Sequence, residues 1–174
     1  RDVERSRGLG DVYKRQGDAP VMETVDLLEV AKECVERQKL NARRAYISLT
    51  YLGESAPVLG SRALLDELCQ NLCDNAIKYN VTGGRVDLSV SCTGGTAAVM
   101  VRDTGIGIPA DQQDRVFERF YRVDKARSRA SGGTGLGLSI AKWIVDRHGG
   151  WFEVVSREDV GTRITFVLPL EGTA

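Results

Sequence analysis

The sequence lacks a surplus of charge of either sign. Its 174 residues include 24 lysines and arginines and 24 aspartates and glutamates, so the formal net charge is zero. A neutral chain has no general electrostatic attraction to nucleic acid or to an anionic membrane. The sequence also contains no apolar run long enough to span a bilayer and no signal peptide. We therefore expect a cytoplasmic domain that binds no nucleic acid and makes no direct membrane contact.

Metal-binding patterns of cysteine and histidine are equally scarce. The four cysteines form no CxxC pair. Cys69 and Cys73 lie four residues apart, but no histidine or further cysteine near them completes a metal site. We expect reduced thiols within a hydrophobic core, as in cytosolic proteins.

The first residues of the chain lack the apolar periodicity seen in the rest. The segment Asp11–Gln16 resembles one reading frame of the transposase recognition end used in sequencing adapters, and such segments do not inform a fold. A genuine polar linker is the alternative. We expect residues 1–16 to be disordered in either case, and residues 17–174 to form one domain.

Helical and strand periodicities follow one another along the remaining chain. Helices are predicted over Val25–Gln38, from the cap Ser61 to about Tyr79, near Gln112–Phe120, and over Gly135–His148. Strands are predicted over Tyr46–Leu49, Pro57–Leu59, Arg85–Ser91, Thr96–Arg102, Trp151–Val155 and Arg163–Leu168, with Gly94-Gly95 as a hairpin turn. This order predicts an α+β fold, a two-layer α/β sandwich whose mixed, mostly antiparallel sheet is covered by helices on one face.

The helix that begins at Ser61 carries two stripes. Its apolar stripe is formed by Leu65, Leu68, Leu72, Ala76 and Tyr79, and its polar stripe by Glu67, Asn71, Asn75 and Lys78. A polar stripe is most often a solvated face, but asparagine is a mediocre helix former and therefore a poor choice for one. Amide oxygens suit a hard cation such as Mg²⁺, and a lysine suits a phosphate.

Two glycine-rich segments flank strands and helices further along the chain. Asp103–Pro109 follows a predicted strand, where glycines permit close backbone approach and a carboxylate can accept from an exocyclic amine. Gly132–Leu138 opens a helix, where exposed backbone N–H groups make an anion site. Each segment taken alone is equally consistent with a tight surface turn. Neither matches a P-loop or a Rossmann fingerprint.

In their order along the chain, four segments resemble the sequence boxes of the ATP-binding catalytic domain of sensor histidine kinases, within the Bergerat-type ATPase superfamily. They are Asn71–Tyr79, Asp103–Pro109, Phe117–Arg122 and Gly133–Leu138. The resemblance covers about residues 22–170, and the stretch Phe120–Arg129 is similar to phosphate-regulon-type sensor kinases.

The resemblance implies a Bergerat fold and a role for each matching residue. The implied catalytic residues are Asn71, Asn75, Lys78 and Arg122, with Asn75 and Asn71 holding Mg²⁺. The implied nucleotide-binding residues are Tyr79, Asp103, Gly105, Ile106, Gly107, Phe117, Phe120, Gly133, Thr134, Gly135, Leu136, Gly137 and Leu138. Asp103 would accept from the adenine amino group, Gly105 and Gly107 would line the adenine pocket, and Phe117 and Phe120 would anchor a lid over roughly residues 119–134.

The implied activity is transfer of the γ-phosphoryl group of Mg-ATP to a histidine. The implied partners are ATP, the histidine-bearing dimerisation domain of the same kinase and, indirectly, a response regulator. The only histidine here, His148, precedes Gly149-Gly150 at a helix end, whereas the family's acceptors lie inside a helix and precede an acidic residue. We therefore expect the acceptor domain to be missing, the fragment not to phosphorylate itself, and the parent protein to be anchored in the bacterial inner membrane.

Three other functions are consistent with parts of this pattern. The basic run Arg119–Arg129 suggests nucleic-acid binding, but Asp124 interrupts it and no stacking platform follows. An ATP hydrolase of the same superfamily would carry a glutamate in place of Asn71, because water needs a general base. A catalytically inactive nucleotide-binding or interaction module is disfavoured by the intact boxes.

Two departures from the family, Ser61 for an aspartate and Asn80-Val81-Thr82 for a threonine-proline turn, affect only a helix cap and a loop.

Overall fold

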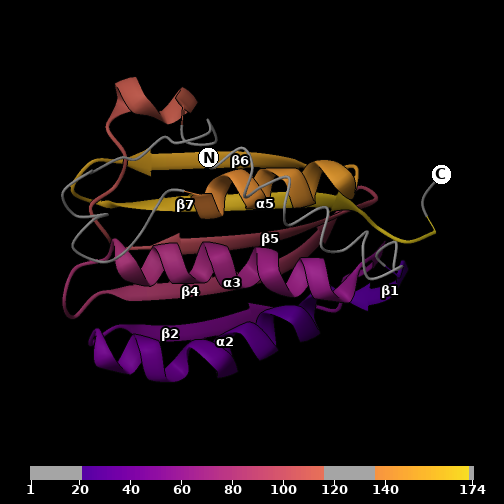
Figure 1. Cartoon of the computed structure of the whole chain (residues 1–174), viewed down its shortest axis with the longest axis horizontal. Coiled ribbons are helices and arrows are strands. Elements are labelled where there is room, and N and C mark those ends of the chain that lie inside the picture. Colours follow the sequence, from indigo (N-terminus) through magenta and orange to yellow (C-terminus); the bar gives the residue numbers. More distant parts are fainter. Residues whose placement is uncertain (1–20, 116–135, 173–174) are drawn as a thin grey trace.

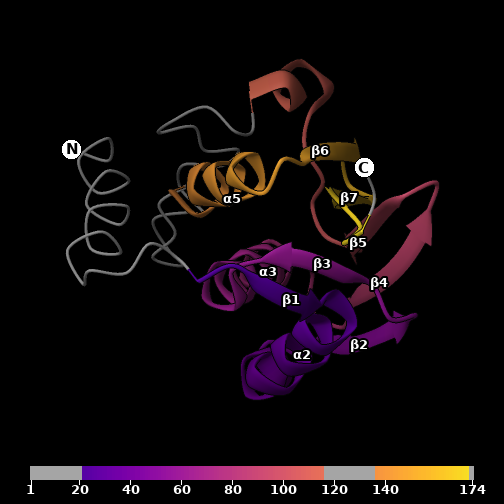
Figure 2. The same ribbon diagram turned by 90° about the vertical axis from the view of Figure 1, so that its right-hand side faces the viewer.

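The described part of the chain forms a sheet with helices on one face. The structure is a computed structural model that describes residues 21–115 and 136–172. Figures 1 and 2 show helices α2, α3 and α5 packed side by side on the same face of this sheet. The two-layer α+β sandwich predicted from the sequence is confirmed.

The sheet within these residues has five strands in the order β2-β4-β5-β7-β6. They are β2 (Ser48–Gly53), β4 (Arg85–Thr93), β5 (Thr96–Asp103), β6 (Trp151–Arg157) and β7 (Gly161–Pro169). Only the β2–β4 pair is parallel, and the other pairs are antiparallel. A small separate sheet pairs β1 (Glu23–Asp26) with β3 (Pro57–Gly60). The predicted mixed, mostly antiparallel sheet is thus confirmed.

The helices are α2 (Leu27–Arg44), α3 (Arg62–Lys78) and α5 (Leu136–Arg147), with a 3₁₀ helix η1 (Ala110–Arg115) after β5. The cap predicted for α3 is confirmed, because the Ser61 hydroxyl accepts from the backbone N–H of Leu64 at 3.3 Å. The helix predicted from Val25 begins later. Val25 pairs with Val58 in the small sheet, and Asp26 caps α2 by accepting from the N–H of Leu28 at 3.0 Å.

The predicted strand Tyr46–Leu49 is wrong at its start. Tyr46 has a φ of 59°, the left-handed conformation that no strand residue adopts. Its carbonyl accepts from the N–H of Gly83, so this residue closes a turn, and β2 begins at Ser48. The strand then runs on to Gly53, further than its apolar pattern indicated, because parallel pairing with β4 supplies its hydrogen bonds.

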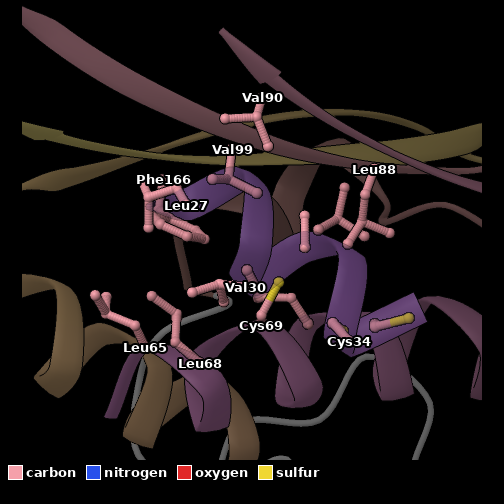
Figure 3. Close-up of a cluster of buried hydrophobic side chains, with 14 of the residues drawn as sticks. Leu27, Val30, Cys34, Leu65, Leu68, Cys69, Leu88, Val90, Val99 and Phe166 are labelled. Atoms are coloured by element: carbon pink, nitrogen blue, oxygen red, sulfur yellow. The ribbon is translucent and has the colours of Figure 1, made fainter. Parts of the chain in front are cut away.

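The hydrophobic core lies between the helices and the inner face of the sheet. Figure 3 shows Val30 and Cys69 facing Leu88, Val99 and Phe166 across this layer. Each of these side chains is almost completely buried, and burying one large aliphatic side chain contributes about 1.5–3 kcal/mol. This packing fixes the rotation of α3, because its apolar stripe must face the sheet.

The cysteines are free, and three of them lie in this core. Cys34 of α2 meets Cys69 and Cys73 of α3, while Cys92 on β4 is only partly buried. The expectation of core thiols therefore holds for three residues and not for Cys92. None of the helices in the described ranges combines the length and apolar character needed to cross a membrane.

Candidate functional site

A small apolar pocket opens between α3, the end of β5, β7 and the start of α5. Its volume is about 80 Å³. The residues that line it are Leu72, Asn75, Ala76, Tyr79, Val101, Asp103, Ile106, Gly107, Ile108, Leu138, Thr162 and Ile164. Most of these side chains are aliphatic, and Asp103 is the carboxylate among them. The pocket is suited to a flat apolar ring that carries a hydrogen-bond donor at one edge.

Asp103 is the last residue of β5 and is held by two backbone groups. Its Oδ1 accepts from the N–H of Gly105 at 2.8 Å and from the N–H of Thr162 at 3.2 Å. Burial raises the pKa of Asp103 to about 6, although both hydrogen bonds act in the opposite direction. Both bonds go to Oδ1, which leaves Oδ2 available to accept from a ligand.

The loop after β5 packs tightly at each of its glycines. A Cβ on Gly105 would collide with the carbonyl oxygen of Tyr79, and a Cβ on Gly107 would collide with that of Arg157. Gly107 also has a φ of 72°, which favours glycine. Gly107 lines the pocket as predicted, but Gly105 does not, because it packs against the end of α3 instead. These glycines therefore allow the loop to fold onto its neighbours.

Only part of the polar stripe of α3 reaches the pocket. Asn75 and Tyr79 line it, whereas Asn71 lies one turn earlier, outside its walls. The Nζ of Lys78 pairs with Asp74 at 3.4 Å and also lies outside the pocket. Glu67, one turn before Asn71, has a buried Oε2 without a hydrogen-bond partner among the described residues. Desolvation raises the pKa of Glu67 accordingly.

The remaining predicted residues follow η1 in the sequence. Arg122, Phe117, Phe120, Gly133, Thr134 and Gly135 lie outside the described residues. Leu136 and Gly137 begin α5, and Leu138 reaches the pocket wall. The N-terminus of α5 therefore adjoins the pocket, and a helix N-terminus favours anions such as phosphate.

His148 lies outside the pocket and is buried between two helices. Its Nδ1 lies 2.7 Å from the carbonyl oxygen of Ile144, and its Nε2 accepts from the N–H of Ser61 at 3.1 Å. Nδ1 must then carry the proton, so the ring is neutral and both nitrogens are engaged. Burial accordingly lowers the pKa of His148. The geometry agrees with a structural role for this histidine.

Some pocket residues were not predicted from the sequence, namely Leu72, Ala76, Val101, Ile108, Thr162 and Ile164. Strand alternation placed Val101 on an inward face, but only the pairing of β5 with β7 brings it opposite Ile164 and brings Asp103 opposite Thr162. No local motif marks Thr162. Its place in the pocket follows from the register of β7 against β5, a strand that is distant in sequence.

Comparison with known proteins agrees with this geometry. A family model described as "Histidine kinase-, DNA gyrase B-, and HSP90-like ATPase" matches residues 60–172. The sensor-like histidine kinase SenX3 of Mycolicibacterium smegmatis is 44% identical over 154 residues, which are 86% of this chain and 39% of that protein. The sensor histidine kinase RppB of Synechocystis is 48% identical over 111 residues, which are 64% of this chain and 24% of that protein. The chain thus spans less than half the length of these relatives.

Solved structures share the fold as well. The mycobacterial sensor histidine kinase MprB superposes with a TM-score of 0.74 at 35% identity, over 86% of this chain and 98% of that one. Full-length ShkA, solved in complex with AMPPNP, has a TM-score of 0.75 at 26% identity, over 93% of this chain and 34% of that one. The chain therefore belongs to the family of histidine kinase-, DNA gyrase B- and HSP90-like ATPases, and within it resembles the catalytic domains of sensor histidine kinases.

Proposed function

We propose that this chain is the ATP-binding catalytic domain of a two-component sensor histidine kinase. It transfers the γ-phosphoryl group of Mg-ATP to a histidine on a dimerisation domain that these residues do not contain. The observation that carries the proposal is Asp103, a partly buried carboxylate at the end of β5 that lines an apolar pocket beside Asn75. The parent protein would be membrane-anchored, with this domain in the cytoplasm, and would pass the phosphoryl group to a response regulator.

The pocket explains selection of adenine. The aliphatic side chains of Val101, Ile164 and Leu72 enclose the ring, and Oδ2 of Asp103 accepts from its exocyclic amine. Guanine presents a carbonyl oxygen at the same edge, so two acceptors would face each other. A buried acceptor left without a donor discriminates strongly between such ligands.

The phosphates would extend from the pocket toward the start of α5. Mg²⁺ fits the side chains available there, because Asn75 lines the pocket, Asn71 lies one helical turn earlier, and both carry amide oxygens. Bound at this position, the metal would neutralise charge on the phosphates. Lys78 would contact the phosphates after leaving Asp74, and we assign Arg122 to the γ-phosphate.

The acceptor must come from another domain. His148 cannot reach a nucleotide without unfolding the junction between α3 and α5, because both of its nitrogens are engaged. Idle hydrolysis should be slow, since Asn71 cannot act as a general base for water. Transfer in trans should be slow too, because the proximity supplied by a linked acceptor is lost.

The test is to mix the chain with ATP labelled at the γ-phosphate, with and without the helical acceptor hairpin of a close relative. Acid-labile, base-stable label should appear on the hairpin alone and should rise with hairpin concentration. Label at His148, or rapid phosphate release without the hairpin, would contradict the proposal.

The metal assignment is tested by Asn75→Ala, with Gln70→Ala as a matched amide control on the same helix. Gln70 accepts from the side-chain amide of Gln38 at 2.7 Å, away from the pocket. Asn75→Ala should weaken ATP binding more with Mg²⁺ than without it, whereas the control should leave both affinities unchanged. Equal losses in the two conditions would show that Asn75 is structural.

A further inference from the structure

A second hollow lies on the opposite face of the sheet from the helices. Its volume is about 240 Å³, and its rim carries Arg102 of β5, Arg157 of β6 and Arg163 of β7, with Val155 and Val160 beside them. Along β5, β6 and β7, the exposed residues Arg102, Val155, Arg157 and Arg163 alternate with buried or partly buried ones that face the helices. The hollow therefore opens on the face that Figure 2 shows turned away from α3 and α5.

The arginines of this hollow lack close acidic partners, although Asp103 lines the hollow and Asp87 lies opposite Arg102 on β4, where it pairs with Arg85. Arg102 and Arg163 are direct cross-strand partners, an arrangement in which like charges repel. Within the part of the chain that the structure describes, none of the three guanidinium groups of the hollow has an acidic partner. Arg85 on the adjacent strand provides a contrast, since it pairs with Asp87 at 3.3 Å. An anionic ligand placed between the two guanidinium groups would attract both and offset their mutual repulsion.

The spacing of the charges indicates an extended peptide. Arg163 lies opposite Val155, and Arg157 lies opposite Gly161, two residues further along the hairpin. Two residues of extended chain span about 6.6–6.8 Å. Acidic side chains at positions i and i+2 of a strand-like segment have the same separation, so one can lie between Arg102 and Arg163 and the next near Arg157.

The neighbouring valines favour a peptide over a small ion. Val155 and Val160 are 56% and 60% exposed, although both are apolar. Inorganic phosphate gains nothing from such surfaces, whereas the aliphatic side chains of a peptide would cover them.

From these observations we propose that the arginine hollow, formed by Arg102, Arg157 and Arg163 with Val155 and Val160, binds an extended acidic segment of a partner protein. The segment presents two carboxylates two residues apart, next to aliphatic side chains. Guanidinium groups hold carboxylates through charge-assisted, often bidentate hydrogen bonds. The hollow shares Asp103 and Thr162 with the lining of the nucleotide pocket, but its three arginines lie outside that pocket. Binding of the segment does not require phosphoryl transfer.

The experiment measures fluorescence polarisation of a labelled peptide with the core Val-Asp-Val-Glu-Val. Its matched control has the core Val-Asn-Val-Gln-Val. The acidic peptide should bind saturably, more weakly as salt rises, and about tenfold more tightly than the neutral one. The double variant Arg102→Gln/Arg163→Gln should lose about tenfold in affinity, while Arg85→Gln, on the same face, should change it less than about twofold.

Three results would overturn the proposal. One is equal weakening by Arg85→Gln and by the double variant, which would indicate general attraction to a basic surface. Another is arginine-dependent binding of inorganic phosphate with no binding of the acidic peptide, which would indicate a small-ion site. The third is arginine-dependent binding of phosphatidylglycerol vesicles alone, which would indicate a membrane-facing surface. Thermal melting of each variant checks its fold, and removing the repelling pair should not lower the melting temperature.

Discussion

At the scale of single residues, burial and function conflict most clearly at Asp103. The folded protein holds this carboxyl group in a pocket that raises its pKa from 3.8 to about 6. The native state therefore binds more protons than the unfolded chain between these values. Stability falls as pH rises through that window, by on the order of 3 kcal/mol in total. Above the window the carboxyl group is ionised, and its burial lowers the free energy of unfolding. This is expected if the charge serves to bind a ligand.

We predict that Asp103→Asn weakens ATP binding without lowering stability. The new side-chain oxygen can accept from Gly105 and Thr162, so its amide nitrogen then faces the pocket. That donor repels the adenine amine, and losing one charge-assisted hydrogen bond should weaken ATP about 10- to 150-fold. Calorimetry with ATP and GTP measures this effect, and the preference for ATP should shrink.

The pH dependence gives a second measurement on the same residue. Adenosine affinity should fall as pH drops below about 6, because the protonated carboxyl group accepts less well, and the asparagine variant should lack this fall. Asp87→Asn, on the far face of the sheet, is the matched control and should behave like the parent. If Asp103→Asn binds ATP as tightly as the parent, Asp103 does not contact adenine.

At the scale of secondary-structure elements, the junction of α3 and α5 sets the geometry of the site. The C-terminus of α5 meets the N-terminus of α3 through the buried ring of His148, which accepts from Ser61 and donates to Ile144. Gly60 makes this approach possible, because a Cβ there would lie 2.8 Å from the imidazole carbon Cδ2. One helix carries Asn75 and the other carries Leu138, so this contact aligns opposite walls of the pocket.

We predict that this junction weakens in acid. The pKa of His148 is lowered in the folded state from 6.5, so the unfolded chain takes up a proton first as pH falls. Stability contributed by the neutral ring is complete above about pH 6.5 and is lost as pH falls through that value toward the lower folded pKa. The chain has one histidine, and Asp103 acts on stability in the opposite direction below about pH 6, so the difference in melting between the parent and a His148 variant isolates this ring.

The variant His148→Leu supplies the control. It leaves the Ser61 N–H without a partner and removes the ring's bond to the Ile144 carbonyl, which keeps the backbone N–H of residue 148. This should cost about 1–3 kcal/mol at neutral pH. The parent and this variant should therefore converge in stability as pH falls below about 6.5. A constant difference at all pH values would show that the ring does not titrate with unfolding.

At the scale of the whole molecule, the fold rests on the sheet and its single layer of helices. Residues 1–16 lie outside the described structure, and their sequence has no apolar period. We predict that deleting them shifts the melting temperature by less than about one degree, since changes away from packed features are usually within about 0.5 kcal/mol. Differential scanning calorimetry of the two chains measures the shift, and a drop of several degrees would show that the segment belongs to the fold.

The sequence by itself determined those features that depend on neighbouring residues. Alternation along Arg85–Ser91 and Thr96–Arg102 predicted paired strands, and Gly94-Gly95, with φ of 56° and 81°, forms the turn between them. Helical spacing separated the stripes of α3, and Ser61 marked its start. These signals are local because side-chain direction in a helix or strand repeats every few residues. The ordered boxes identified the family for the same reason, since each is a short contiguous segment.

Only the tertiary structure decided which of these segments meet. The left-handed turn at Tyr46, the packing of Gly105 on Tyr79, and the place of Thr162 beside Asp103 depend on contacts between distant residues. The same applies to the arginine hollow, because Arg102 and Arg163 are distant in sequence and become neighbours through the register of β5 and β7. Strand register is set by burial of one whole face against the helices, so a shift of one residue in a strand would turn the arginine of that strand inward. That cost is a property of the folded sheet, which no single segment of the sequence contains.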